Sequence, residues 1–366
     1  MFLGIRDIVY AKGRFALIGG VVGLITLLLV MLTGLTGGLG LQNTSALRSM
    51  DADRFAFGSS SEDAPEVSFA NSSVTQQEVS EWADVEGVSS AIPVGFTQTE
   101  FSAEHSVGVA VIGVPEDSEM VRHAAGEAIR GTSALQEGGV VISQSVAEQS
   151  GAEVGEKVSI AGDALTVEGI VPDEYYSHTP AVWVPTTEWT QLAHAPQNAV
   201  GTVIALQGSL SEDAWAKGEE VTHTKVVTTQ GSFSGLAAYA SEQGSLLTMQ
   251  GFLYGISALV TVSFLTVWTI QRTRDIAVLR ALGAGGRYLI RDAVGQAAIV
   301  LGAGVVAGAL VGLGLGLLAQ QFVPFLLSWT TILGPAGGIW ALGLLGSLLA
   351  VRRVAKVDPL IALGGN

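Results

Sequence analysis

The sequence predicts an α-helical membrane bundle of four transmembrane helices, one before and three after an inserted α+β extracytoplasmic domain of two sub-regions. Four stretches without charge are each long enough to span a bilayer, which takes about 20 residues in a helix. A long polar region separates the first stretch from the other three. The composition, 48% hydrophobic and 14% charged residues, lies between a pure membrane bundle and a soluble protein with about 25% charged residues.

Acidic and basic residues are separated along the chain. Residues 42–243 contain 7 Lys and Arg against 29 Asp and Glu, a net charge of −22, whereas the rest of the chain carries +7. Basic residues concentrate on the cytoplasmic side of membrane helices. We therefore expect both termini in the cytoplasm and the acidic region outside the cell.

The first predicted transmembrane helix, residues 15–39, follows Arg6, Lys12 and Arg14. A cleavable signal peptide is the alternative, but its apolar region has roughly 7 to 15 residues and ends in a small-residue cleavage motif, whereas this stretch has about 25 residues. We therefore interpret it as a membrane anchor that the mature protein keeps.

Residues 42–243 alternate between short apolar runs and turn residues, as expected of an α+β domain. Thr75 and Glu78 form a capping-box pattern, which predicts a helix that begins at this point. Polar residues 115–138 are interpreted as the linker or insertion between two sub-regions. Runs rich in Val and Ile and bounded by Gly, Pro or Asp predict strands at 107–114, 139–143, 157–160, 165–171 and 181–184.

Three further helices, 245–270, 293–318 and 332–351, follow the outer domain. The second of these has glycine at every fourth position, which places the glycines on one helix face that can approach another helix closely. This face is either packed within one chain or forms the seam of a homodimer. The glycines are Gly304, Gly308, Gly312 and Gly316.

Catalytic motifs are absent from the sequence. It has no cysteine, no phosphate-binding loop ending in Gly-Lys-Ser/Thr, no His-Glu-x-x-His and no Gly-x-Ser-x-Gly. The five histidines are scattered without metal-ligand spacing. We therefore expect no enzyme, no permanently bound cofactor, no metal site and no nucleic-acid partner, and any ATP must be hydrolysed by another protein.

The basic segment 271–291 lies between the second and third predicted spans, and a second basic segment, 352–366, ends the chain. Within the first, Ile276, Leu279 and Leu282 or Gly283 lie along one side of a short predicted helix. Such a face can insert into the groove of a soluble partner. Alternatively, the segment is a charged loop that only sets the membrane topology.

The run Arg-Thr-Arg-Asp-Ile-Ala-Val-Leu-Arg-Ala-Leu-Gly-Ala, residues 272–284, resembles the coupling segment of FtsX/MacB-type ABC permeases. Asp275 stands where glutamate is commoner, and Asp358-Pro-Leu resembles the ending of that family. The resemblance implies a second copy of the chain and two copies of a cytoplasmic ABC ATPase that holds ATP and Mg. It implies that the residues that dock on this ATPase are Arg272, Arg274, Asp275, Ile276, Leu279, Arg280, Leu282 and Gly283.

The N-terminal part is similar to the DevC/HrtB branch of the same family, from Leu3 to Gly19 and in Thr-Gly-Leu-Thr-Gly-Gly-Leu at 33–39. The resemblance implies a cytoplasmic amphipathic helix at residues 1–14 and a turn at 33–39, at the outer end of the first span. HrtB-type members export haem from bacterial cells. Haem or a similar amphipathic molecule is therefore the expected substrate, and the bacterial plasma membrane and its lipid are the expected surroundings.

A haem substrate requires an apolar slot and axial iron ligands. The candidates near the outer ends of the first two spans are Met31 and Glu242 as iron ligands, Tyr239 and Met249 as further contacts, and Phe252 as a stacking ring. Alternatively, the methionines fill gaps in the packing and Glu242 only begins a helix.

Two further hypotheses remain open. The loop 175–178, Tyr-Tyr-Ser-His, either receives substrate or packs its rings on the domain core. The whole chain is either an exporter or an FtsX-like transmembrane relay that regulates a cell-wall hydrolase. An exporter could also carry a lipoprotein, a peptide or an antibiotic in place of haem.

Overall fold

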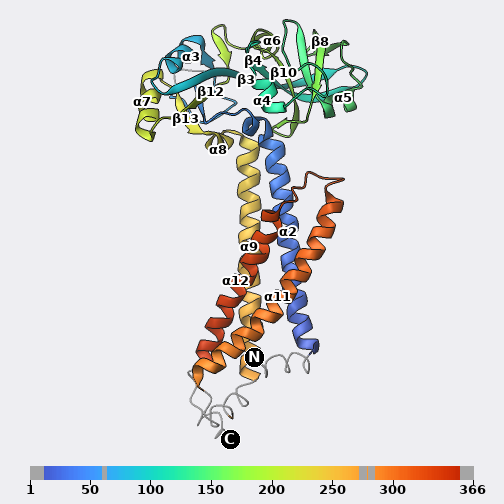
Figure 1. Cartoon of the computed structure of the whole chain (residues 1–366), viewed down its shortest axis with the longest axis vertical. Coiled ribbons are helices and arrows are strands. Elements are labelled where there is room, and N and C mark those ends of the chain that lie inside the picture. Colours follow the sequence, from blue (N-terminus) through green and yellow to red (C-terminus); the bar gives the residue numbers. More distant parts are fainter. Residues whose placement is uncertain (1–11, 60–63, 272–277, 279–284, 355–366) are drawn as a thin grey trace. The chain divides into compact units, whose positions relative to one another are not determined.

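The computed structural model describes residues 12–59, 64–271, 278 and 285–354. The chain forms two compact units. One unit, residues 1–38 and 244–366, is built from long helices, and the other, Leu39–Gln243, contains the strands and short helices (Figure 1).

Four helices in the described part of the chain are long and apolar enough to cross a membrane. One precedes the strand-containing unit along the chain and three follow it. The first continues to Ser49, ten residues beyond the end expected for the first span. The helices are α2 (Lys12–Ser49), α9 (Ala237–Gln271), α11 (Gly286–Ala319) and α12 (Trp329–Val354).

The core of the helical unit is formed by apolar side chains of α2, α11 and α12, among them Val22, Leu29, Leu301 and Ile339. Close approach of α2 and α11 depends on glycines. A Cβ atom at Gly304 would lie 2.5 Å from the backbone oxygen of Gly19, and one at Gly308 would lie 2.2 Å from that of Gly23. The glycine face of α11 therefore packs within one chain, as one of the two interpretations predicted.

The other unit, hereafter the sheet unit, is built on one mixed sheet of eleven strands. The strand order is β13-β1-β12-β3-β4-β10-β6-β8-β5, with β7 beside β3 and β8, and β9 beside β10. The strands are β1 (Arg54–Phe57), β3 (Val88–Ser102), β4 (Ser106–Val114), β5 (Arg130–Gly131), β6 (Gly139–Ser143), β7 (Lys157–Ile160), β8 (Asp163–Val171), β9 (Tyr175–Tyr176), β10 (Thr179–Pro185), β12 (Val203–Gly208) and β13 (Lys225–Thr228), and a separate pair is β2 (Val74–Thr75) and β11 (Ala199–Gly201).

Short helices cover this sheet (Figure 1). On one face α3 and α7 pack on β1 and β12 through Trp82 and Trp215, while α5 and α6 pack on β4, β6 and β10 through Val146 and Trp189. A third cluster, on the opposite face, includes α4 and the C-terminal end of α2. The short helices are α3 (Gln76–Ala83), α4 (Met120–Ala125), α5 (Gln144–Ser150), α6 (Thr186–Leu192), α7 (Glu212–Thr222), α8 (Thr229–Ser232) and the 3-10 turn η1 (Phe233–Gly235).

Local sequence signals in this unit are confirmed. Thr75 caps α3, since its hydroxyl accepts from the Glu78 backbone and the Glu78 carboxylate accepts from the Thr75 backbone. The five predicted strands are present as β4, β6, β7, β8 and β10. The interpretation of residues 115–138 as a linker between sub-regions is wrong, because α4 packs into the shared core and β5 pairs with β8. The two helix-covered regions instead meet along β3, which pairs with β12 at one end and β4 at the other.

Candidate functional site

The predicted docking segment for an ATPase lies outside the described residues. It comprises Arg272, Arg274, Asp275, Ile276, Leu279, Arg280, Leu282 and Gly283, between the end of α9 and the start of α11.

Within the sheet unit, a strained hairpin turn is held against the C-terminal end of α2. Ser177 and His178 join β9 to β10 and both have positive φ angles, 49° and 66°. A two-residue turn of this kind favours Asn-Gly, because other side chains clash in the left-handed region. Here the backbone N–H groups of Ser177 and His178 donate to the carbonyl oxygens of Asn43 and Gln42, at 3.1 and 2.9 Å. Docking on α2 therefore compensates for the strain.

Three polar side chains meet beside this turn. The Nε2 atom of His178 lies 3.0 and 3.1 Å from the two carboxylate oxygens of Glu242, which belongs to α9. The Nδ2 atom of Asn43, on α2, lies 3.0 Å from this imidazole nitrogen and 3.0 Å from Glu242 Oε2. The side chains of His178 and Glu242 are 31% and 37% exposed, whereas Asn43 is buried. We call these three residues the junction cluster.

The rest of the hairpin packs on α2 and on the sheet core. The backbone N–H of Tyr175 donates to the Ser45 hydroxyl at 2.7 Å. Tyr176 is buried and stacks on Phe96 with 4.6 Å between ring centres, and burial raises the pKa of its hydroxyl. The alternative that the Tyr rings of this loop pack on the core is thus confirmed for Tyr176.

Glu174 lies at the start of the same hairpin. Burial raises the pKa of its carboxyl group, while hydrogen bonds from Ser45 and Ser49 of α2 act in the opposite direction. Its Oε2 atom is buried without a hydrogen-bond partner. A charged carboxylate is therefore destabilised at this position.

The remaining sequence candidates are Tyr239 in the sheet unit and Met31, Met249 and Phe252 in the helical unit. Tyr239 packs edge-on against Phe233, with 5.7 Å between ring centres. In the helical unit, Met249 and Phe252 are 53% and 69% exposed on α9, and Met31 is half-buried on α2. Sequence reasoning singled out Glu242 but missed Asn43, and no local pattern links residues 43, 178 and 242.

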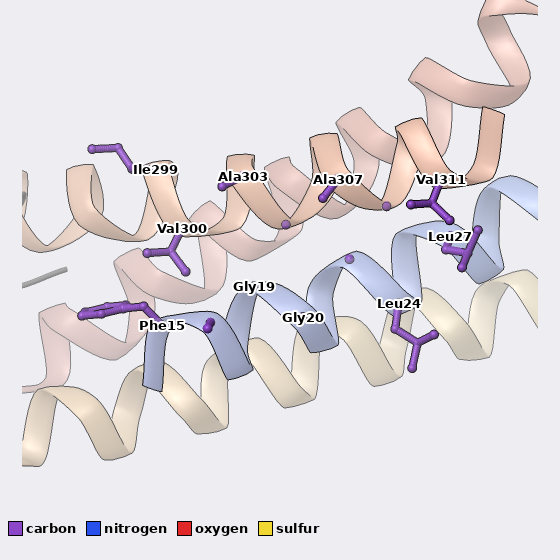
Figure 2. A pocket seen from close by; sticks show the side chains of 14 residues that line it. Phe15, Gly19, Gly20, Leu24, Leu27, Ile299, Val300, Ala303, Ala307 and Val311 are labelled. Carbon is purple, nitrogen blue, oxygen red and sulfur yellow. The ribbon is translucent and has the colours of Figure 1, made fainter. Parts of the chain in front are cut away.

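The helical unit has a groove of about 640 Å³ along α2 and α11 (Figure 2). Figure 2 shows Val300 and Val311 of α11 directed toward α2, with Phe15 at one end of the groove. Every lining residue is Phe, Ala, Gly, Leu, Ile or Val. The groove can therefore hold an apolar molecule or chain, but its side chains provide no iron ligand.

The predicted turn at residues 33–39 is wrong, because this segment is helical and lies inside α2. Its glycines instead provide space for the loop between α11 and α12. A Cβ atom at Gly38 would lie 2.0 Å from the Pro324 carbonyl oxygen, and one at Gly34 would lie 2.1 Å from the Phe325 ring. The Gly34 carbonyl accepts from the Leu326 backbone at 2.9 Å. Gly34 and Gly38 therefore let the loop between α11 and α12 approach α2 closely, and they do not reverse the chain.

A sheet unit inserted among long apolar helices is the architecture of a membrane protein with a large domain outside the bilayer. Residues 15–219 match the family described as MacB-like periplasmic core domain, and residues 248–359 match that described as FtsX-like permease C-terminal. The chain therefore belongs to the FtsX/MacB-type family of ABC transporter permeases.

Relatives match the chain over its full length. A protein of Staphylococcus haemolyticus, provisionally named hemin transport system permease protein HrtB, is 26% identical over 369 residues, which cover 100% of this chain and 99% of the relative. An uncharacterized ABC transporter permease of Mycobacterium bovis is 25% identical over 371 residues, with the same two coverages. The solved extracellular domain of the noncanonic ABC-type transporter YknZ from Gram-positive bacteria is 14% identical and covers 49% of this chain and 99% of that domain, with a TM-score of 0.37.

Proposed function

We propose that this permease is a subunit of an ATP-driven efflux pump that exports haem or a similar amphipathic molecule. The full-length similarity to proteins named hemin transport permeases supports the cargo. A separate ATPase subunit would hydrolyse the ATP, because the sequence has no phosphate-binding loop.

The division of charge supports an orientation for the four long helices. The sheet unit, with a net charge of −22 over residues 42–243, would lie outside the cell, and the basic segments 271–291 and 352–366 would lie in the cytoplasm. Four spans, one before and three after the sheet unit, then leave both termini in the cytoplasm. In this orientation the segment Asp275–Gly283 faces the ATPase.

A second copy of the chain would complete the pump. Apolar side chains on α9 are exposed in the single chain, among them Leu247 at 59%, Phe252 at 69% and Leu259 at 67%. A second permease copy, membrane lipid or the cargo would cover this face, since a helix that is apolar on an uncovered side is stable only in a non-aqueous environment. Two copies of the permease would then engage two ATPase subunits.

Iron ligands and an apolar surface are the two features that a haem site needs. Met31 and Glu242 remain the proposed iron ligands, with Tyr239 and Met249 as further contacts. Phe252 could stack on the macrocycle, because its ring is exposed rather than packed in the core.

Deletion of the gene tests the cargo. A deletion strain should grow poorly at haem concentrations that the parent strain tolerates, and sensitivity to a panel of antibiotics and peptides should not change. A plasmid copy of the gene should restore growth of the deletion strain in haem, and copies with Met31 or Glu242 replaced should not. A control copy with exposed Leu310 replaced by Ala should restore growth fully. Unchanged haem tolerance would remove haem as the cargo, and a cell-separation defect would favour the FtsX-like relay.

A further inference from the structure

The donor atoms of the junction cluster are arranged as the ligands of a small metal ion would be. His178 Nε2, Glu242 Oε2 and Asn43 Nδ2 form a triangle with sides of 3.1, 3.0 and 3.0 Å. Ligands in neighbouring positions of an octahedron are separated by √2 times the metal–ligand distance. For a distance of about 2.1 Å, common for nitrogen and oxygen ligands, the expected separation is about 3.0 Å.

The amide of Asn43 can provide the third ligand by its oxygen. Asn43 is fully buried, and its Oδ1 atom has no hydrogen-bond partner, whereas Nδ2 contacts both other members of the cluster. Buried polar atoms without partners are rare and costly. Rotation of the amide by half a turn would turn Oδ1 toward His178 and Glu242, at the loss of the 3.2 Å bond from Nδ2 to the Leu39 carbonyl and of the Nδ2 contacts to both side chains. Coordination by Oδ1 would have to offset these losses.

The backbone supports a binding role for the imidazole. His178 adopts a left-handed conformation with φ of 66°, and such strain at a non-glycine residue costs about 1–3 kcal/mol. A glycine or asparagine would form the same turn with less strain. Strained positions of this kind concentrate at binding sites.

We propose that Asn43, His178 and Glu242 bind a divalent first-row transition-metal ion on the outer surface of the protein. One imidazole nitrogen, one carboxylate oxygen and one amide oxygen form a mixed set of ligands, and imidazole is the member of this set that suits Zn, Cu, Fe and Ni. The partial exposure of His178 and Glu242 leaves the other coordination positions to water or a further ligand. A bound ion would join α2, the β9–β10 turn and the start of α9.

The geometry favours such an ion over haem iron held between the same side chains. Two axial ligands of a haem lie on opposite sides of the iron, about 4 Å apart at metal–ligand distances near 2.0 Å. Here the imidazole nitrogen and the carboxylate are 3.0 Å apart, as ligands in neighbouring positions are. Because Glu242 is also a proposed haem ligand, haem and the ion would compete for its carboxylate.

Calorimetric titration of the purified full-length chain, with any histidine tag removed, tests the proposal. Zn²⁺ and Co²⁺ should each bind with a stoichiometry of one per chain. His178→Asn keeps a residue that tolerates the left-handed conformation but removes the imidazole, and it should weaken binding at least about tenfold, the lower end of effects seen on altering metal sites. Glu242→Gln should have a similar effect.

His194→Asn is the matched control, since His194 is exposed and also has a positive φ angle, 50°. It should bind both ions as the wild type does. Absence of stoichiometric binding to the wild type, or equal affinity of wild type and His178→Asn, would overturn the metal site. Haem binding that is kept by His178→Asn but lost by Glu242→Gln would leave the proposed transport function intact and separate the two sites.

Discussion

Gly308→Ala tests whether backbone contact between α2 and α11 stabilises the helical unit. A Cβ atom at this position would lie 2.2 Å from the Gly23 carbonyl oxygen and 2.9 Å from Thr26 Cβ. An ordinary contact begins near 3.4 Å, so the helices must separate locally by about 1 Å. Overpacking of this size costs about 1–3 kcal/mol, and it opposes a gain of about 1 kcal/mol from replacing glycine by alanine within a helix.

Gly314→Ala is the control on the same helix, because no atom lies within 4 Å of a Cβ atom at that position. Both substitutions have the same effect on helix propensity, so the difference between them isolates the contact with α2. The free energy of unfolding, measured by equilibrium denaturation in detergent micelles, should be about 1–3 kcal/mol lower for Gly308→Ala than for Gly314→Ala. Equal stability of the two variants would refute the close packing of α2 and α11.

Three further predictions concern the cap, a buried carboxyl group and the ATPase contact. Thr75→Ala removes the cap of α3 and should lower the free energy of unfolding by about 1 kcal/mol. Thr187→Ala, at an exposed position, should change the free energy of unfolding little. Equal changes in the two variants would argue against a stabilising cap at Thr75. Burial raises the pKa of Glu174, so the folded state favours the protonated carboxyl group. The stability that the protonated group contributes is present below the usual pKa of 4.5 and is lost as the pH rises through the raised pKa of the folded state. Glu174→Gln should therefore unfold at a higher temperature than wild type at pH 8 but not at pH 4; a gain that does not depend on pH would contradict the burial argument. Leu279→Asp should abolish co-purification of the ATPase subunit with the permease. Ala281→Asp, on the opposite side of the predicted helix, should leave co-purification unchanged. If both variants still co-purify with the ATPase subunit, docking through the apolar face of this helix is excluded.

Features set by neighbouring residues could be predicted from the sequence. The cap of α3 needs only Thr75 and Glu78, three residues apart, and strands such as β6 and β7 are short apolar runs between turn residues. The helix α4 and the two-residue β5 were missed because segments this short have no measurable periodicity.

Features set by the tertiary fold could not be predicted in the same way. Glycines at residues 33–39 suggested a turn, but glycine serves equally for close approach, and only the position of Pro324 and Phe325 distinguishes the two roles. The Ser177-His178 turn lacks Asn and Gly, the usual signal. Glu242 could be chosen as the last acidic residue before an apolar helix, yet its partners are 64 and 199 residues away.

Transport by the reconstituted complex tests the proposed function most directly. The permease and its ATPase, placed together in liposomes, should move haem across the membrane when ATP is added, and haem should increase the rate of ATP hydrolysis. The permease alone should hydrolyse no ATP. ATP hydrolysis by the permease alone, or ATP hydrolysis by the complex without movement of haem, would contradict the proposal.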